Sequence, residues 1–454
     1  MAISDIVGAI HLTTRPEVLS ANATDATRLV FMPEAVARPG SPDEVSRILS
    51  LADRERFPVI PRGAGTGQSG GALPVRGGLV LTMDRLDRIL AIDPANMIAR
   101  VEPGVITGRL RDAVEALGLF YPPDPASIDI STIGGNVAEC AGGLRAVKYG
   151  VTRDYVLGLE IVLPTGEIIR TGVETAKGVV GYDLTRLIVG SEGTLAVVTK
   201  ITLRLIPLPA ARRTMLAFFN DPAGAVKTVT GLVQSRVVPT TLEFMDRVCI
   251  DCVRDDLGLV VPDTAAALLL MEVDGDEGLV ARDAERVRRV ALECGAVHFQ
   301  AAQGEEEAEL LWKARRNVSP ALQSLRPGKV SEDIVVPRSR LADLVAFLKP
   351  LSLKHGQPIA AFGHAGDGNI HVHILLDPED PEEKANTENI VLELFKEVIR
   401  MGGTLSGEHG VGITKAPYLG LELAKPARNL MRRLKQAFDP NNILNPGKIF
   451  PEDL

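Results

Sequence analysis

The residues best suited to chemistry are histidines gathered in one part of the chain. The sequence holds seven, at positions 11, 298, 355, 364, 371, 373 and 409, so four of them fall between 364 and 409. His371 and His373 stand two apart in a strand-like stretch, which would point both side chains to one face. Glu408 and His409 stand between glycines, where another backbone segment can approach closely. Two imidazoles and one carboxylate with an open position form a common catalytic site for Zn²⁺ or another divalent first-row metal. For any single histidine, a hydrogen-bonded place in the core is the alternative.

A second group with evident chemistry is the glycine-rich stretch Pro-Arg-Gly-Ala-Gly-Thr-Gly-Gln-Ser-Gly-Gly at residues 61–71. Exposed amide N–H groups in such a stretch form a concave anion site suited to a phosphate or pyrophosphate. It is not a P-loop, because no Lys-Ser/Thr pair follows its last glycine. It is not a Rossmann fingerprint, because Pro74, Gly77 and Gly78 break any helix behind it. The remaining alternative is a turn that binds no ligand. Further small-residue loops at 131–136, 140–143 and 190–194 make this alternative weaker.

Cationic side chains form a third group, in the run Trp312-Lys313-Ala314-Arg315-Arg316. This run closes a predicted helix that begins with three glutamates at 305–307. A guanidinium there could bind both oxygens of a carboxylate in a fork. The alternative is a solvated helix held by ion pairs between successive turns.

The whole chain sets limits on what these groups do. Its 454 residues, with 45% hydrophobic residues, predict a globular protein of two or three domains. A net charge of −8 disfavours a nucleic-acid binder. Four cysteines, two of them as Cys249 and Cys252, predict ordinary thiols and no disulfide framework. The first residues lack a signal-peptide pattern and no apolar run is long enough to span a membrane, so we expect a cytoplasmic protein.

Turn and cap signals divide the chain into two regions with different patterns of predicted secondary structure. Ser41 and Pro42 predict the start of a helix over 45–52. Strands are expected at 57–61, 79–82, 89–92, 97–101, 156–163 and 168–171, with a helix at 106–117. Pro207 and Pro209 suggest a domain boundary. Beyond it, strands at 215–219, 241–245, 268–273 and 298–301 alternate with helices at 223–235 and 278–294, which predicts an antiparallel sheet. Strands at 333–336 and 359–363 and helices at 341–355, 382–401 and 423–438 follow.

Several short motifs together resemble one family. Residues 61–67, Ile133-Gly134-Gly135-Asn136, Tyr149-Gly150, Leu163-Pro164-Thr165-Gly166 and Gly190-Ser191-Glu192-Gly193-Thr194 stand in the order of the FAD-binding domain of the vanillyl-alcohol oxidase/p-cresol methylhydroxylase superfamily. The chain is similar to its branch of D-lactate dehydrogenases, flavoprotein subunits of glycolate oxidase, and D-2-hydroxyglutarate dehydrogenase. The resemblance implies an α+β fold: a PCMH-type FAD-binding domain of two α+β subdomains at 1–208, and a cap domain with a helix-flanked antiparallel sheet at 209–404. A C-terminal segment at 405–454 would return to the FAD-binding domain.

The same resemblance implies where FAD binds. The loop would wrap the pyrophosphate with Arg62, Gly63, Ala64, Gly65, Thr66, Gly67, Gln68 and Ser69. The flavin and adenosine would lie along Thr132, Gly135, Asn136, Ala138, Gly142, Gly150 and Val198, and Asn445 would reach back to the flavin ring. Many relatives attach FAD covalently through a histidine in or near this loop. The loop here has neither His nor Cys, so we expect dissociable FAD.

The resemblance also implies roles for the histidine cluster. His364, His371 and Glu408 would hold a divalent metal, Zn²⁺ or Mn²⁺/Fe²⁺, and His409 would be the general base. His373 is either a partner that supports the ligands or a further ligand, and both readings stay open. Arg315 is the favoured cation for a substrate carboxylate, with Arg338 and Lys329 as weaker candidates.

These roles predict an FAD- and metal-dependent D-2-hydroxy-acid dehydrogenase of the D-lactate, glycolate or D-2-hydroxyglutarate type. It would pass hydride to flavin N5, form a 2-oxo acid and send electrons to a quinone, cytochrome or partner flavoprotein. The alternatives are an oxidase that forms H₂O₂, a transferase like alkyl-glycerone-phosphate synthase, and a silent subunit of a complex. A basic face with Arg428, Arg432, Arg433 and Lys435 could contact the inner face of a membrane, although a solvated face is the simpler reading. A homodimer is one assembly that fits.

Overall fold

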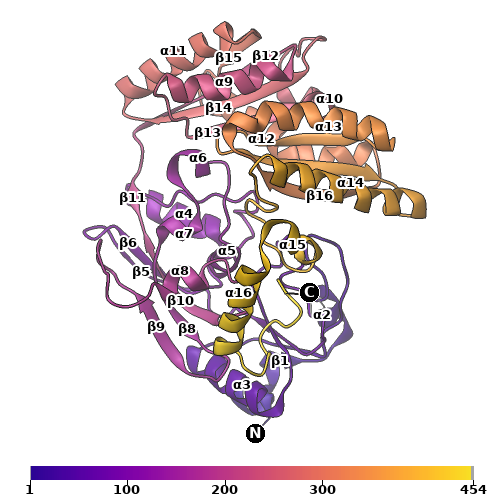
Figure 1. The fold of residues 1–454 in the computed structure, drawn as a ribbon. Helices are drawn as coiled ribbons and strands as arrows, with labels where there is room; N and C mark the ends of the chain where they lie inside the picture. The colour runs from indigo at the N-terminus through magenta and orange to yellow at the C-terminus, as the bar shows by residue number, and fades with distance from the viewer. Residues whose placement is uncertain (1, 451–454) are drawn as a thin grey trace. The chain divides into compact units, whose positions relative to one another are not determined.

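The computed structural model describes residues 2–450. The chain forms two compact units, and each is described here by itself. Unit 1 comprises Met1–Gly142, Gly150–Leu208 and Glu408–Leu454, and unit 2 comprises Gly143–Tyr149 and Pro209–Gly407. In Figure 1 the indigo N-terminal strands and the yellow C-terminal helices belong to unit 1, and the orange helices to unit 2.

The first sheet of unit 1 positions the glycine-rich loop. Its strand order is β1-β2-β4-β3, where β1 is Leu12–Thr13, β2 Ala35–Ala37, β4 Leu79–Thr82 and β3 Val59–Arg62. Strand β3 runs parallel to β4 and ends where the loop begins. Helix α3 (Pro42–Glu55) starts as predicted: Ser41 accepts a hydrogen bond from the Glu44 amide, and Pro42 occupies the first helical turn. Its buried face, with Ile48 and Leu49, packs into the core beside this sheet.

A second sheet of unit 1 is entirely antiparallel, with the order β5-β6-β10-β8-β9. Its strands are β5 (Ile89–Asp93), β6 (Ile98–Val101), β10 (Val197–Arg204), β8 (Val156–Val162) and β9 (Ile168–Gly172). The ribbon β7 (Leu119–Phe120) and β11 (Ile206–Pro207) lies apart from both sheets. The remaining helices of unit 1 are α1 (Ile3–Val7), α2 (Pro16–Ala21), α4 (Thr107–Glu115), α5 (Ile133–Glu139), α7 (Thr152–Tyr155), α8 (Leu184–Ile188), α15 (Leu419–Glu422) and α16 (Lys425–Phe438).

Unit 2 is built on one seven-stranded antiparallel sheet with the order β15-β12-β14-β13-β17-β18-β16. The strands are β12 (Ala211–Phe219), β13 (Thr241–Asp246), β14 (Ala267–Gly275), β15 (Ala296–Ala301), β16 (Gly328–Val335), β17 (Ile359–His364) and β18 (Asn369–Leu376). The predicted antiparallel sheet flanked by helices is confirmed.

Helices cover both faces of this sheet. Helices α9 (Pro222–Gln234), α11 (Glu277–Glu293), α13 (Leu341–His355) and α14 (Pro381–Arg400) pack on one face (Figure 1). Helices α10 (Arg247–Cys252) and α12 (Glu305–Ala321) pack on the other, where Phe218, Met245, Leu270 and Phe362 form part of an apolar core. The one-turn helix α6 (Ala146–Tyr149) contacts β13.

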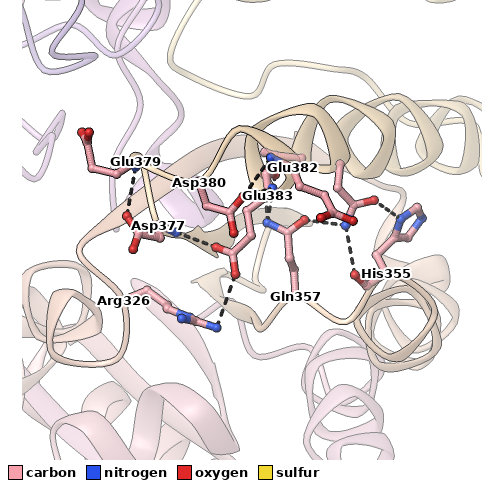
Figure 2. Close-up of polar contacts among 10 residues, drawn as sticks. Arg326, His355, Gln357, Asp377, Glu379, Asp380, Glu382 and Glu383 are labelled. Atoms are coloured by element: carbon pink, nitrogen blue, oxygen red, sulfur yellow. Dashed lines mark hydrogen bonds and ion pairs between the residues drawn. The ribbon is translucent and has the colours of Figure 1, made fainter.

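The start of α14 is fixed by a polar network (Figure 2). Asp380 caps the helix by accepting hydrogen bonds from the amides of Glu382 and Glu383. The Glu383 carboxylate accepts from the Asp377 amide at 2.6 Å and pairs with Arg326 at 3.4 Å. These contacts tie the chain leaving β18 to the beginning of β16, so the two strands that carry and flank the histidines are held at that end.

Two elements differ from the sequence prediction. Residues 133–139, expected as a small-residue loop, form α5, because Thr132 supplies a helix cap by accepting a hydrogen bond from the Gly135 amide at 3.1 Å. Helix α12 does not close at residue 316 but runs through Pro320 to Ala321. A proline near the last turn leaves only one helical carbonyl without its donor, which the helix tolerates.

Candidate active site

Three histidines lie on one face of the unit 2 sheet. Strands β17 and β18 form a hairpin in which Phe362 pairs with His371 and His364 with Asn369. On the outer side of β18, Ser331 of β16 pairs with His373. Cross-strand partners and residues two apart share a face. The face covered by α10 and α12 therefore carries His364, His371 and His373, and the last two point the same way.

The register adds a carboxylate that the sequence did not single out. Glu243 of β13 is the cross-strand partner of His364. Its side chain is fully buried, and its Oε1 lies 2.6 Å from His364 Nδ1. A carboxylate can only accept, so Nδ1 carries a proton, and Nε2 is the ring nitrogen that can bind a metal.

His364, His371 and Glu408 come together as a set of metal donors. Each offers one ligand atom, and these atoms all lie within 4.8 Å of one another. The His364 and His371 rings meet edge to face with centroids 5.1 Å apart. Glu408 directly follows Gly407, whose amide donates to the backbone and side-chain oxygens of Asp333 in β16 at 3.2 and 2.9 Å. Two imidazoles and a carboxylate suit Zn²⁺, Mn²⁺ or Fe²⁺, so the donors present fit a divalent metal.

His373 lies outside this set of converging donors. Its Nδ1 is 3.1 Å from Ser331 Oγ, and its ring stacks on Phe362 with centroids 4.8 Å apart and planes 13° apart. Phe362 also contacts His371, at 5.5 Å between centroids. Of the two roles left open for His373, the packing favours a supporting residue behind the donors.

The three candidate cations for a substrate carboxylate are placed very differently. Arg315 is buried and donates from Nε to Glu243 Oε2 at 2.7 Å. Lys329 Nζ donates to the carbonyl and hydroxyl of Ser319 in α12, at 2.6 and 2.5 Å. Arg338 is exposed just after β16, beside the β17–β18 hairpin, where the Val336 amide donates to Gly368.

Charge around Glu243 is closely balanced. Burial by itself would raise the pKa of the Glu243 carboxyl, but the neighbouring His364 and Arg315, through charge and hydrogen bonds together, hold that pKa at about 2. The carboxylate is therefore ionised at any physiological pH.

In unit 1 the loop after β3 has the form of an anion cradle. Within residues 2–450, the amide N–H groups of residues 64–68 donate to no protein acceptor. Gly65 has φ +70°, and a Cβ there would overlap the Arg62 guanidinium. A Cβ at Gly63 would lie 2.4 Å from Thr132 Oγ1. Glycine is thus required for the loop shape, and a row of unpaired amides fits a pyrophosphate.

Other side chains expected along FAD support this loop or its neighbours. Arg62 is buried and donates to the carbonyls of Thr24 and Ala72, at 2.7 and 3.3 Å. Asn136 Nδ2 donates to Thr107 Oγ1 at 2.8 Å and joins α5 to α4. The carbonyl of Ala138 accepts from the Glu192 amide at 2.8 Å. Gly142 is buried and Gly150 has φ +83°, while Val198 lies on β10. Their roles toward FAD remain predictions.

His409 is close to the loop. Its Nε2 lies 3.1 Å from Gln68 Nε2. An amide nitrogen can only donate, so in this arrangement the imidazole Nε2 is the acceptor. A histidine placed next to this loop is suited to the role of a general base.

The C-terminal segment of unit 1 holds the other end of the loop. The Ile413 amide donates to the Ser69 carbonyl at 2.8 Å, and Asn445 Nδ2 donates to the Gly71 carbonyl at 2.8 Å. The buried Lys448 amine donates to the carbonyls of Gly71, at 3.3 Å, and Leu73, and to Asn445 Oδ1, at 3.0 Å. Asn445 therefore faces the loop backbone, and Lys448 is a supporting residue that no pattern in the sequence singles out.

The buried Lys448 makes stability depend on pH. Burial lowers the pKa of this amine to about 8, although Glu192 partly offsets the effect. The unfolded chain keeps the ordinary pKa of about 10.4, so between these values it binds a proton that the folded chain lacks. Stability from this group therefore rises with pH across that window, by about 3 kcal/mol in all.

Urea unfolding of wild type and Lys448→Met at pH 7.5 and pH 10 checks this expectation. The difference in unfolding free energy should shift in favour of the wild type as pH rises, because the variant lacks the titrating group. A difference that stays constant between the two pH values would contradict it.

Comparison with known proteins places these features in a family. Residues 33–172, which include the glycine-rich loop and α5, match the family described as FAD binding domain. Residues 208–449, which include the histidine sheet, match FAD linked oxidases, C-terminal domain. The chain belongs to the FAD-linked oxidase family.

Two curated relatives and one solved structure illustrate the likeness of this FAD-linked oxidase. Glycolate oxidase subunit GlcD of Bacillus subtilis is 48% identical, over 93% of this chain and 90% of that protein. D-lactate dehydrogenase of Anaerostipes hadrus is 35% identical, over 92% and 89%. The structure of p-cresol methylhydroxylase with substrate bound covers 100% of this chain and 96% of its own, with a TM-score of 0.83 and 20% identity, which shows a shared fold.

The family resemblance inferred from the short motifs is thereby confirmed. The protein is an FAD-dependent oxidoreductase with a PCMH-type fold. None of the helices in the described part of the chain has the length and apolar character that a membrane span requires.

Proposed function

We propose that this FAD-linked oxidase is a metal-dependent dehydrogenase of D-2-hydroxy acids, of the D-lactate, glycolate or D-2-hydroxyglutarate type. The observation that carries the proposal is the convergence of His364, His371 and Glu408, with His409 next in the chain. The names of the relatives, a glycolate oxidase subunit and a D-lactate dehydrogenase, support a hydroxy acid as the substrate.

The proposed role of each residue follows from the atoms that it offers to a metal or a substrate. His364 Nε2, His371 and Glu408 would hold a divalent ion, and the chemistry that this ion would supply is Lewis acidity toward the oxygens of the substrate. FAD, held on the glycine-rich loop, would supply the hydride acceptor for the Cα hydrogen. His409 would take the hydroxyl proton, and loss of this proton together with the Cα hydride converts the hydroxy acid to a 2-oxo acid.

The placement of the cations refines the proposed recognition of the substrate. Arg315 and Lys329 already hold Glu243 and Ser319. Arg338 is exposed at the hairpin end of the sheet, on the side where His364 ends β17. We therefore favour Arg338 as the direct contact for a second carboxylate or other distal polar group of the substrate.

The test is reduction of an artificial dye by the purified yellow protein, screened against paired D- and L-2-hydroxy acids. We expect turnover with at least one D-acid or with glycolate, and little with the L-acids. Failure to reduce dye with every acid would favour the transferase or the silent subunit. Rapid, complete reoxidation of the reduced protein by air would instead favour an H₂O₂-producing oxidase.

Further assignments are proposals of the same kind. FAD should be dissociable, which release of all yellow colour on acid precipitation would show. We propose a quinone, cytochrome or partner flavoprotein as electron acceptor, a cytoplasmic location with the inner membrane face as a contact surface, and a homodimer. Lys435 is not part of a free basic face, since its amine donates to the carbonyls of Thr194 and Leu444 at 2.8 Å.

A further inference from the structure

The buried pair of Glu243 and Arg315 has no part in the mechanism so far. Glu243 lies on β13, at the centre of the unit 2 sheet, and Arg315 reaches it from α12 on the covering face. The side chain of Glu243 is completely inaccessible and that of Arg315 is 9% exposed. Taking an isolated charge out of water is costly, so a buried carboxylate at this place calls for a purpose beyond packing.

The two oxygens of Glu243 are used by different partners. His364 Nδ1 occupies Oε1 at 2.6 Å, and Arg315 occupies Oε2 with both Nε and Nη2, at 2.7 and 2.5 Å. The guanidinium also lies over the Phe362 ring, 4.5 Å from its centroid. With both oxygens engaged and the arginine stacked, the carboxylate cannot rotate without breaking one of these contacts.

The consequence falls on His364. A carboxylate that accepts from Nδ1 keeps a proton there, directs the ring, and makes Nε2 the nitrogen that binds a metal, with greater ligand basicity. Metal-binding histidines depend on this kind of partner, whose loss typically weakens metal affinity 10–100-fold. Arg315 holds the other carboxylate oxygen, so it fixes the orientation of Glu243 and acts on His364 through that residue.

We propose that Glu243 and Arg315 are a positioning pair that sets the tautomer, direction and donor strength of His364 toward a divalent metal ion. The inference rests on the metal set of the proposed function.

The experiment measures metal binding by the FAD-loaded protein stripped with a chelator. Co²⁺ is titrated in, and its affinity and visible ligand-field spectrum are recorded for wild type, Glu243→Gln and Arg315→Lys. The matched control is Glu272→Gln. Glu272 is a buried carboxylate on the adjacent strand β14, and it accepts from Thr214 and Trp312 instead of a histidine.

For Glu243→Gln we expect Co²⁺ affinity to fall 10–100-fold and the spectrum to change. The amide has nearly the same volume as the carboxylate but carries no charge. Arg315→Lys should give a smaller loss in the same direction, and Glu272→Gln should bind Co²⁺ as the wild type does. Glu243→Asp, which restores the charge, should recover part of the affinity.

Other outcomes overturn the proposal and separate it from the proposed function. Wild-type affinity and spectrum in Glu243→Gln would overturn the positioning role alone. An increase in KM for Arg315→Lys with unchanged Co²⁺ binding would return Arg315 to direct substrate contact. If Glu243→Gln does not fold, unchanged Co²⁺ binding by Arg315→Lys would overturn the proposed positioning role of the two residues. A wild-type protein that binds no Co²⁺ would contradict the metal-dependent function itself.

Discussion

Replacing His409 with alanine is expected to lower turnover of the best hydroxy acid by about 10²–10⁴-fold, the usual contribution of a positioned general base. FAD should stay bound, because the contacts of His409 with the loop run through the Gln68 side chain, whereas Ile413, Asn445 and Lys448 hold the loop backbone. The measurement is steady-state dye reduction together with the flavin absorbance of the purified variant.

A matched control for this variant is His355→Ala. His355 lies at the end of α13, in the network of Figure 2, and contacts Asn386 and Glu393 of α14. It is not one of the converging metal donors. It should retain turnover within a few-fold of wild type. If His409→Ala turned over as fast as this control, His409 would not be the base.

Removing the metal should have an effect of similar size. Treating the yellow protein with a chelator is expected to lower turnover by at least about 10²-fold, since a Lewis acid on the substrate oxygens supplies several kcal/mol of stabilisation in the transition state. Adding back Zn²⁺, Mn²⁺ or Fe²⁺ should restore the rate with one of them. Metal content and flavin absorbance, measured on the same samples, show that the ion and not FAD was lost.

A second preparation makes this prediction specific to the three donors. Glu408→Gln should purify with less metal than wild type and should recover little turnover on metal addition, because an amide is a poor ligand for these ions. A metal-free wild-type protein with full activity would contradict the prediction, as would a Glu408→Gln variant that keeps its metal and its rate.

The sequence was most informative where chemistry depends on neighbouring residues. The spacing of His371 and His373 was enough to place both on one sheet face, and the glycines of the loop were enough to predict its open amides. The helix cap at Ser41 and the alternation of strands and helices beyond residue 210 depend on local signals of the same kind.

The supporting contacts could not be predicted from local sequence signals because they join residues that lie far apart along the chain. Glu243 meets His364 across a strand pair separated by 121 residues, and nothing near Glu243 in the sequence indicates that partner. The family resemblance pointed Arg315 toward a substrate carboxylate, and the sequence alone left a solvated helix as the alternative. Nothing in the sequence indicated that the fold buries Arg315 against Glu243. Register and helix packing decide both contacts, and they are properties of the assembled sheet.

The contacts of Lys448 have a consequence for biosynthesis. This amine lies 375 residues after the Leu73 carbonyl that it binds, and Asn445 lies 374 residues after Gly71. A ribosome adds about 5–20 residues per second, so the glycine-rich loop emerges roughly 20–75 seconds before these partners. During that interval the nascent loop lacks the hydrogen bonds from Asn445 and Lys448 that hold its backbone. We therefore expect flavin to be loaded onto the shaped loop only after almost the entire chain has been synthesised.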